Sequence, residues 1–267
     1  MIESKDKIGV FDSGMGGLTV LREIEKSLPY ENIVYYADSK NCPYGDKTSE
    51  EILFHTRESV LKLINIGVKL IVIACNTATS SAIKSLRNEF SDVIFVAIEP
   101  AVKPATEITR NGNIAVIATQ YTVNGERLKQ LCEKYSENTN ILRLATPKLV
   151  ALVENNKENT PYCTSVLEEY FQTIIKHNID TVVLGCTHYS FLRKDMEAIA
   201  KKHNIQILDA AKAIAKQTVN KLTEKEIHTT SRNKGNIEFL SSLDEEYNNK
   251  LKNKYIEYKT YGTSEHE

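Results

Sequence analysis

The sequence has no excess of charge of either sign and no dense block of basic residues. It contains 34 Lys and Arg residues against 35 Asp and Glu residues, and 26% of its 267 residues are charged. A nucleic-acid-binding surface usually needs a concentrated basic patch, so we expect no nucleic-acid partner. The lysine-rich stretch 248–254 near the end of the chain is typical of a solvated helical face.

Long apolar runs are also missing. Although 41% of the residues are hydrophobic, no stretch near the N-terminus is long enough for a signal peptide or a membrane span. We therefore expect a cytoplasmic protein that makes no contact with a membrane.

The cysteines are few, and their spacing fits neither a disulfide framework nor a structural metal site. There are five, an odd number, in a chain large enough to be stable without disulfides. No CxxC pair or Cys/His zinc spacing is present, so no metal is expected. Two nucleotide-binding signatures are absent as well: Thr19 stands where a dinucleotide fingerprint needs glycine, and no P-loop lysine follows.

Apolar, β-branched runs alternate with amphipathic segments along most of the chain, which indicates an α/β fold with mainly parallel strands. The expected strands are 8–11, 33–36, 70–74, 93–97, 114–118, 141–144, 181–184 and 205–208. The expected helices are 18–27, 50–66, 80–90, 124–135, 161–177, 193–203 and 211–222.

The chain length and the alternating pattern favour two similar three-layer α/β domains that face each other across a central cleft. The stretch 99–113 carries two prolines and an Asn-Gly pair, which are typical of a boundary. We expect one domain to comprise residues 1–98 and 209–267, and the other residues 99–208. In this arrangement the short apolar run 237–240 completes the first domain.

Two cysteines stand out because each follows a buried-looking strand and precedes polar residues, in IVIACNTATS around Cys75 and in VVLGCTHYSF around Cys186. Open α/β sheets bind ligands beyond the carboxyl ends of their strands, so both thiols fall at positions typical of a site. Two thiols on opposite sides of one substrate would remove a proton from one face and return it to the other. His188 is a candidate partner for Cys186, and Asp12 for Cys75.

Other polar residues occupy similar positions at the ends of strands. Glycines after Asp12 and Ser13 in FDSGMGG would let backbone amides approach an anion. The turn Pro43–Tyr44–Gly45 would present amides and a phenol to a ligand, and Thr119 and Thr122 would present hydroxyls. Glu154 follows an apolar helical turn, and from the sequence it is either a site residue or a solvated one.

Five motifs in this order resemble those of the cofactor-independent glutamate racemases of bacterial peptidoglycan synthesis. They are IGVFDSGMGGLTVLREI from Ile8, PYG from Pro43, ACNTAT from Ala74, IEPA from Ile98 and LGCTHY from Leu184. The resemblance implies racemisation at the α-carbon of glutamate by two-base proton transfer, with no cofactor and no metal. Cys75 would deprotonate the D-enantiomer and Cys186 the L-enantiomer, and Asp12, Glu154 and His188 would assist them.

The resemblance also implies a set of residues that bind L- or D-glutamate. They are Asp12, Ser13, Pro43, Tyr44, Gly45, Asn76, Thr77, Thr119, Thr122, Thr187 and His188. A homodimer is the expected assembly. Three alternatives stay open at this point: an aspartate or broad-specificity amino-acid racemase, a ligand-binding protein without turnover, and a thiol redox protein that joins Cys75 to Cys186.

Overall fold

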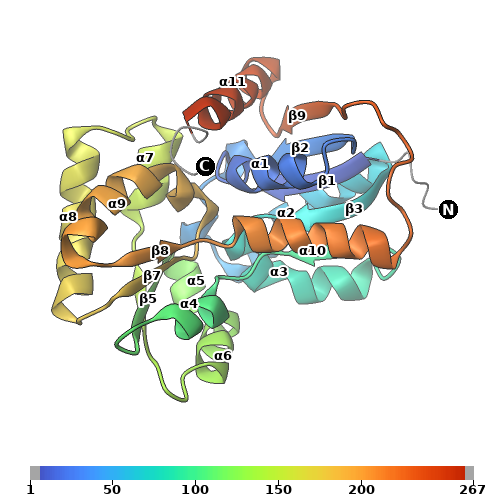
Figure 1. Ribbon diagram of the computed structural model, residues 1–267. Coiled ribbons are helices and arrows are strands. Elements are labelled where there is room, and N and C mark those ends of the chain that lie inside the picture. Colours follow the sequence, from blue (N-terminus) through green and yellow to red (C-terminus); the bar gives the residue numbers. More distant parts are fainter. Residues whose placement is uncertain (1–6, 262–267) are drawn as a thin grey trace. The chain divides into compact units, whose positions relative to one another are not determined.

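Two parallel β-sheets with flanking helices organise the chain in the computed structural model, which describes residues 7–261 (Figure 1). One unit is formed by residues 7–44, 48–98 and 211–261, and the other by residues 45–47 and 99–210. The expected α/β class with parallel sheets is thus confirmed. We propose that each unit is a domain.

The first unit contains a five-stranded sheet with the order β4-β3-β1-β2-β9, in which all pairings are parallel. Its strands are β1 (Lys7–Asp12), β2 (Ile33–Ala37), β3 (Val68–Ile73), β4 (Phe95–Ala97) and β9 (Ile237–Ser241). Its helices are α1 (Leu18–Ser27), α2 (Ser49–Ile66), α3 (Asn76–Glu89), α10 (Ala211–Glu224) and α11 (Glu245–Tyr261). The residues of β3 from Leu70 to Ile73 are fully buried, as expected for a strand covered on both faces.

The second unit contains a four-stranded sheet with the order β6-β5-β7-β8, which is also parallel throughout. Its strands are β5 (Asn113–Ala118), β6 (Asn140–Ala145), β7 (Thr181–Leu184) and β8 (Gln206–Leu208). Its helices are α4 (Val102–Ile108), α5 (Gln120–Asn124), α6 (Glu126–Lys134), α7 (Lys148–Glu154), α8 (Pro161–Lys176) and α9 (Arg193–Ala200), and the short 3₁₀ segment η3 (Thr187–Leu192) follows β7.

Both sheets share one topology. In the first sheet β1 lies between β2 and β3, and β4 lies beyond β3, while β9 adds a fifth strand beyond β2. In the second sheet β5 lies between β6 and β7 in the same way, and β8 lies beyond β7. The strand order therefore reverses between β1 and β3 in one unit and between β5 and β7 in the other. Open α/β sheets bind ligands at this reversal, beyond the carboxyl ends of the strands.

The ends of the helices follow from local sequence. Thr48 and Glu51 form a capping box at the start of α2, and Gly67 ends that helix in the left-handed conformation with φ 81°. Thr160 caps α8, and Pro161 occupies its first turn, where a missing N–H costs nothing. Among the described residues, no helix combines the length and the apolar character needed to cross a membrane.

The eight expected strands are confirmed, and the apolar run at 237–240 forms β9 beside β2. The helix predictions were wrong in three respects. Helix α3 begins at Asn76 rather than at residue 80, because Cys75 caps it. The helix predicted over 124–135 is α6, which begins only after Gly125, and helices α4, α5 and α7 were not expected. The lysine-rich stretch lies in α11, as predicted, where Leu251 is buried and most other side chains face solvent.

Asp180 lies just before β7 and binds the loop that leads into β5. Its carboxylate accepts hydrogen bonds from the Thr109 hydroxyl at 2.6 Å, from the Thr181 hydroxyl at 2.8 Å and from the backbone N–H groups of Arg110 and Asn111 at 2.7 and 2.9 Å. Burial alone would raise the pKa of Asp180, but these donors outweigh it and hold the pKa below its ordinary value.

We expect Asp180→Asn to destabilise the fold by roughly 1–3 kcal/mol at pH 7, because the donors lose a charged acceptor. A depressed carboxyl pKa contributes stability above the unfolded-state pKa of about 4, and this stability is lost as the pH falls through the folded-state pKa. The difference from wild type should therefore shrink below about pH 4. Urea unfolding followed by circular dichroism at both pH values measures it.

The exposed carboxylate of Asp92 provides the matched control, since the described residues offer it no hydrogen bond. Asp92→Asn should leave stability almost unchanged at both pH values. If Asp180→Asn lowered the free energy of unfolding equally at neutral and at acid pH, the stabilisation would not come from the carboxylate charge.

Candidate active site

The first thiol lies where β3 becomes α3, at the strand reversal of the first unit. Cys75 is the second residue after β3 ends at Ile73, and Ala74 N–H donates to Phe11 O at 2.8 Å, which aligns the turn with β1. The sulfur caps α3 by accepting a hydrogen bond from Ala78 N–H at 3.4 Å. The N-terminal end of a helix favours negative charge, so this position stabilises a thiolate.

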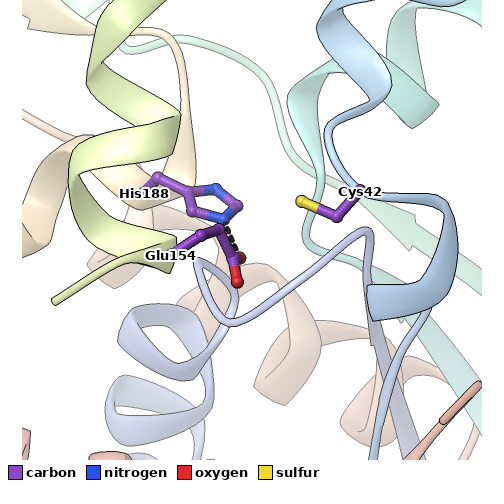
Figure 2. Close-up of side chains that lie close together, drawn as sticks. All are labelled: Cys42, Glu154 and His188. Carbon is purple, nitrogen blue, oxygen red and sulfur yellow. Dashed lines mark hydrogen bonds and ion pairs between the residues drawn. The ribbon is translucent and has the colours of Figure 1, made fainter.

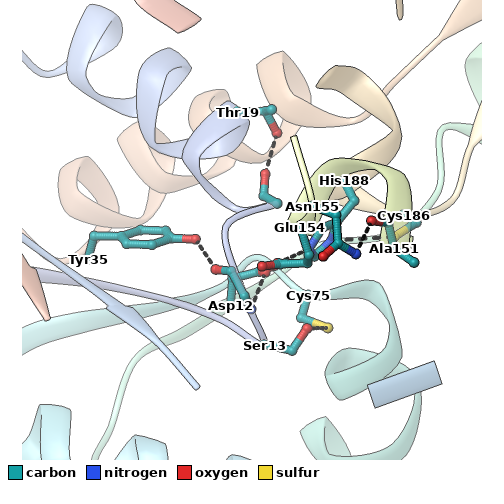
Figure 3. A network of polar contacts seen from close by, with 12 residues as sticks. Asp12, Ser13, Thr19, Tyr35, Cys75, Ala151, Glu154, Asn155, Cys186 and His188 are labelled. Atoms are coloured by element: carbon teal, nitrogen blue, oxygen red, sulfur yellow. Dashed lines mark hydrogen bonds and ion pairs between the residues drawn. The ribbon is translucent and has the colours of Figure 1, made fainter. Parts of the chain in front are cut away.

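The chain just after β1 supplies a polar neighbour to this thiol. Ser13 Oγ lies 3.4 Å from Cys75 Sγ, and Asp12 Oδ1 accepts from Gly14 N–H at 2.9 Å (Figure 3). Gly17 is required here, since a Cβ on it would lie only 2.6 Å from Asp12 Cβ. Tyr35 supports the same turn by donating to Gly14 O at 2.7 Å. Ser13, which the sequence indicated only as a substrate-binding residue, is thus a direct neighbour of the thiol.

The first turn of α3 brings two further predicted residues beside Cys75. Asn76 and Thr77 are both buried, and Asn76 Oδ1 makes no hydrogen bond within the described part of the chain. A buried amide oxygen without a partner is costly in a finished fold. It therefore marks a position where a ligand or water would complete the hydrogen bonding.

The turn at Pro43–Tyr44–Gly45 is ordered by an internal contact. Tyr44 is buried, and its hydroxyl donates to Asp38 Oδ2 at 2.6 Å. Burial, together with the negative charge of Asp38, raises the pKa of this phenol far above its ordinary value. The phenol therefore stays protonated and engaged with Asp38, a partner that sequence reasoning missed.

The second thiol occupies the equivalent place in the second unit. Cys186 is the second residue after β7 ends at Leu184, and Gly185 N–H donates to Ile117 O at 2.8 Å, as Ala74 does to Phe11. Thr187 begins η3 directly after it and is buried. Both thiols are thus presented by the third strand of sheets with the same strand order.

An imidazole and a carboxylate follow this thiol in a chain of contacts. Cys186 Sγ lies 3.9 Å from His188 Nδ1 (Figure 3). His188 Nε2 lies 2.7 Å from Glu154 Oε1 at the end of α7 (Figure 2). The His188 side chain is 3% exposed and that of Glu154 19%. When Nε2–H donates to Glu154, Nδ1 is left to accept the thiol proton. Glu154 is thus paired with His188 rather than simply solvated, and its role as a site residue stays a prediction.

Thr119 and Thr122 lie at the strand reversal of the second unit, after β5. Thr119 caps α5: its Oγ1 accepts from Thr122 N–H at 3.3 Å and lies 3.1 Å from Thr122 Oγ1. Gly45 packs against Thr119 so closely that a Cβ on it would lie 2.7 Å from Thr119 Cβ. Both residues are buried at the strand end, and their part in binding a substrate stays a prediction.

Two other cysteines, Cys132 and Cys163, are held in the thiol form by their surroundings. Burial raises the pKa of Cys132 to about 11, and burial together with Asp195 raises that of Cys163 to about 12. Both thiols stay protonated at neutral pH and are poor bases. No disulfide joins any of the five cysteines, all of which lie in the described residues.

Sequence comparison relates the chain to one family over most of its length. The Asp/Glu/hydantoin racemase family matches residues 8–218. The glutamate racemase of Clostridium acetobutylicum is 40% identical over 246 residues, which is 92% of this chain and 95% of that protein. The glutamate racemase of Herpetosiphon aurantiacus is 42% identical over 237 residues, or 89% and 92% of the two chains.

Solved structures give the same relationship. A glutamate racemase isoform from Bacillus anthracis superposes with a TM-score of 0.85 at 30% identity, covering 95% of this chain and 94% of that one. The Escherichia coli glutamate racemase, solved with L-glutamate and the activator UDP-MurNAc-ala, gives a TM-score of 0.81 at 28% identity, covering 94% and 95%.

Proposed function

This chain belongs to the Asp/Glu/hydantoin racemase family of isomerases, and we propose that it interconverts L- and D-glutamate. The observation that carries the proposal is the matched placement of Cys75 and Cys186, each two residues beyond the third strand of its sheet. Relatives about 40% identical over nearly the whole chain are glutamate racemases, which supports glutamate over a shorter substrate.

In the proposed reaction one thiol is a thiolate and the other a thiol at the start of each turnover. Cys186 removes the α-proton of L-glutamate, and Cys75 delivers a proton to the opposite face of the carbanion; the roles reverse for D-glutamate. The helix cap at Cys75 and the His188–Glu154 pair beside Cys186 each favour removal of the thiol proton. The mechanism requires that both thiols reach one α-carbon.

The remaining polar residues would bind the substrate and stabilise the carbanion. The α-hydrogen beside a carboxylate is a very weak acid, so donors must meet the negative charge that develops in the transition state. The side chains of Asn76, Thr77, Thr119, Thr122 and Thr187 are buried at the strand ends and can supply them. Each such donor is typically worth about 3 kcal/mol in the transition state. This chemistry needs neither a metal nor an organic cofactor.

A polarimetric assay in the presence of a metal chelator tests the proposal. L-glutamate should lose its optical rotation completely, with D-glutamate formed, whereas L-aspartate should react far more slowly. If L-aspartate reacted faster than L-glutamate, the substrate would be aspartate, and the assignment to the same family would stand. No turnover of either would contradict the proposal and favour a binding protein.

The proposed cellular role follows from the product. D-glutamate is a building block of peptidoglycan, so the enzyme would act in cell-wall synthesis in the cytoplasm. We also propose a homodimer, and light scattering of the purified protein at working concentration would test it.

A further inference from the structure

A buried tyrosine directly follows His188 and reaches across the carboxyl end of the second sheet. Tyr189 is fully buried, and its hydroxyl donates to Thr146 O at 3.0 Å. The Thr146 hydroxyl in turn donates to the same phenol oxygen at 3.0 Å. Thr146 is fully buried as well, so both side chains exchange hydrogen bonds away from solvent.

Thr146 is also bonded through its backbone to two other segments of the site. Its N–H donates to Ala118 O at 2.9 Å, immediately before Thr119. Its carbonyl accepts from Leu149 N–H at 3.2 Å in the first turn of α7, the helix that ends at Glu154. Thr146 therefore joins the segment that carries Glu154 to the one that carries Thr119.

Tyr189 adds the third segment, the turn that carries the thiol. Its N–H donates to Cys186 O at 3.2 Å, so the phenol holds a short turn whose other members are Cys186, Thr187 and His188. Burial raises the pKa of the phenol well above its ordinary value, with the negative charge of a Cys186 thiolate acting in the same direction. Tyr189 thus remains a hydrogen-bond donor throughout the neutral pH range.

We propose that Tyr189 and Thr146 are positioning residues that fix the distance between Cys186, His188 and Glu154. This inference rests on the proposed function, because the geometry matters only if Cys186 exchanges a proton. The relay spans two contacts, of 3.9 and 2.7 Å; Cys186 and His188 come from one turn, and Glu154 comes from α7. Without the Tyr189–Thr146 link the turn would keep its own 3₁₀ hydrogen bond and its packing against α7, but the positions of Cys186 and His188 relative to Glu154 would be less fixed.

Tyr189→Phe keeps the ring and removes only the hydroxyl, and Thr146 Oγ1 can turn to Ala118 O, 3.4 Å away. We expect kcat to fall by roughly 10- to 100-fold with KM little changed, as for a small displacement of a catalytic group. Because the two enantiomers of glutamate have equal free energy, kcat/KM must fall by the same factor in both directions. The loss of rate therefore cannot reveal which thiol is affected.

Primary isotope effects on kcat/KM with α-deuterated substrates identify the affected thiol. If only proton transfer at Cys186 is impaired, that step becomes limiting in both directions. The isotope effect should then rise towards its intrinsic value with deuterated L-glutamate and fall towards the smaller equilibrium value with deuterated D-glutamate. A general loss of structure would not make the two effects diverge.

Tyr255→Phe is the matched control, because Tyr255 of α11 is also buried and donates to a carboxylate, Glu25, at 2.5 Å. It should leave kcat and both isotope effects unchanged. Thr146→Val and Thr146→Ser provide a second test if Tyr189→Phe does not fold. Valine removes one of the two hydrogen bonds to the phenol and should give the same divergence to a smaller degree, and serine, which keeps the hydroxyl, should give wild-type values.

The wild-type protein in the same assay separates the two proposals. Absence of racemisation by wild type would contradict the proposed function itself. Active wild type with Tyr189→Phe and Thr146→Val at unchanged kcat, or with isotope effects that change in parallel for both enantiomers, would overturn the positioning role alone.

Discussion

Replacing either Cys75 or Cys186 by alanine is expected to reduce racemisation by roughly 10⁴-fold in both directions. In the proposed mechanism each direction uses both thiols, one to remove the α-proton and the other to deliver a proton to the opposite face, so the reaction needs both. Loss of a positioned acid or base typically costs 10²- to 10⁴-fold, and water cannot replace a thiol inside a buried site. Both thiols are less than a tenth exposed, at 5% and 8%. Initial rates with L- and with D-glutamate measure the effect.

Cys132→Ala is the matched control for these variants. Cys132 is buried to a similar degree but lies on α6, and its raised pKa keeps it protonated. This variant should keep wild-type activity even if it is somewhat less stable. Near-normal racemisation by either Cys75→Ala or Cys186→Ala, with correct folding verified by circular dichroism, would exclude the two-thiol mechanism.

His188→Asn is expected to lower kcat by roughly 10²- to 10³-fold, because the imidazole is the group placed to accept the Cys186 proton. Glu154→Gln should cost less, roughly 10-fold, since the carboxylate acts only through His188. Its bond to Nε2 orients the ring and stabilises the imidazolium, as the carboxylate does in a Ser-His-Asp triad.

The double variant tests whether the two residues form one relay. If Glu154 acts only through His188, the His188→Asn/Glu154→Gln enzyme should be no slower than His188→Asn alone. Losses that multiply would mean independent roles for the two residues. His177→Asn, a change at an exposed histidine at the end of α8, should leave kcat unaltered.

The positions of the strands and of both thiols could be predicted because each depends on a local pattern. A run such as Leu70–Ile73 is apolar enough to be buried on both faces, and the residues that follow it must then lie at the edge of the sheet. Parallel pairing places all such strand ends at one edge of their sheet. The sequence alone therefore placed Asp12 near Cys75 in outline, and Thr119 and Thr122 beyond the end of a strand.

Contacts that depend on tertiary packing could not be predicted in this way. Nothing in the sequence marks Thr146, which lies in an undistinguished loop, as the partner of Tyr189. Tyr189 itself stands within the LGCTHY motif, so its position gave a signal, but its buried phenol gave none. Helix α7 was missed because seven residues are too few for a clear helical period, although they carry Glu154.

The two-thiol mechanism requires that one group removes the proton from one face of the α-carbon and a different group delivers a proton to the other face. Racemisation of L-glutamate in heavy water, sampled early and analysed by proton NMR and by mass spectrometry after chiral separation, tests it most directly. A second thiol that exchanges with solvent delivers deuterium to the product, whereas a single base returns the proton it removed.

With two thiols, the first D-glutamate formed should carry deuterium at its α-carbon, while the remaining L-glutamate keeps its α-hydrogen. D-glutamate that retains the original α-hydrogen would show that one base serves both faces. Such a result would contradict the assignment of Cys75 and Cys186 to opposite sides of the substrate.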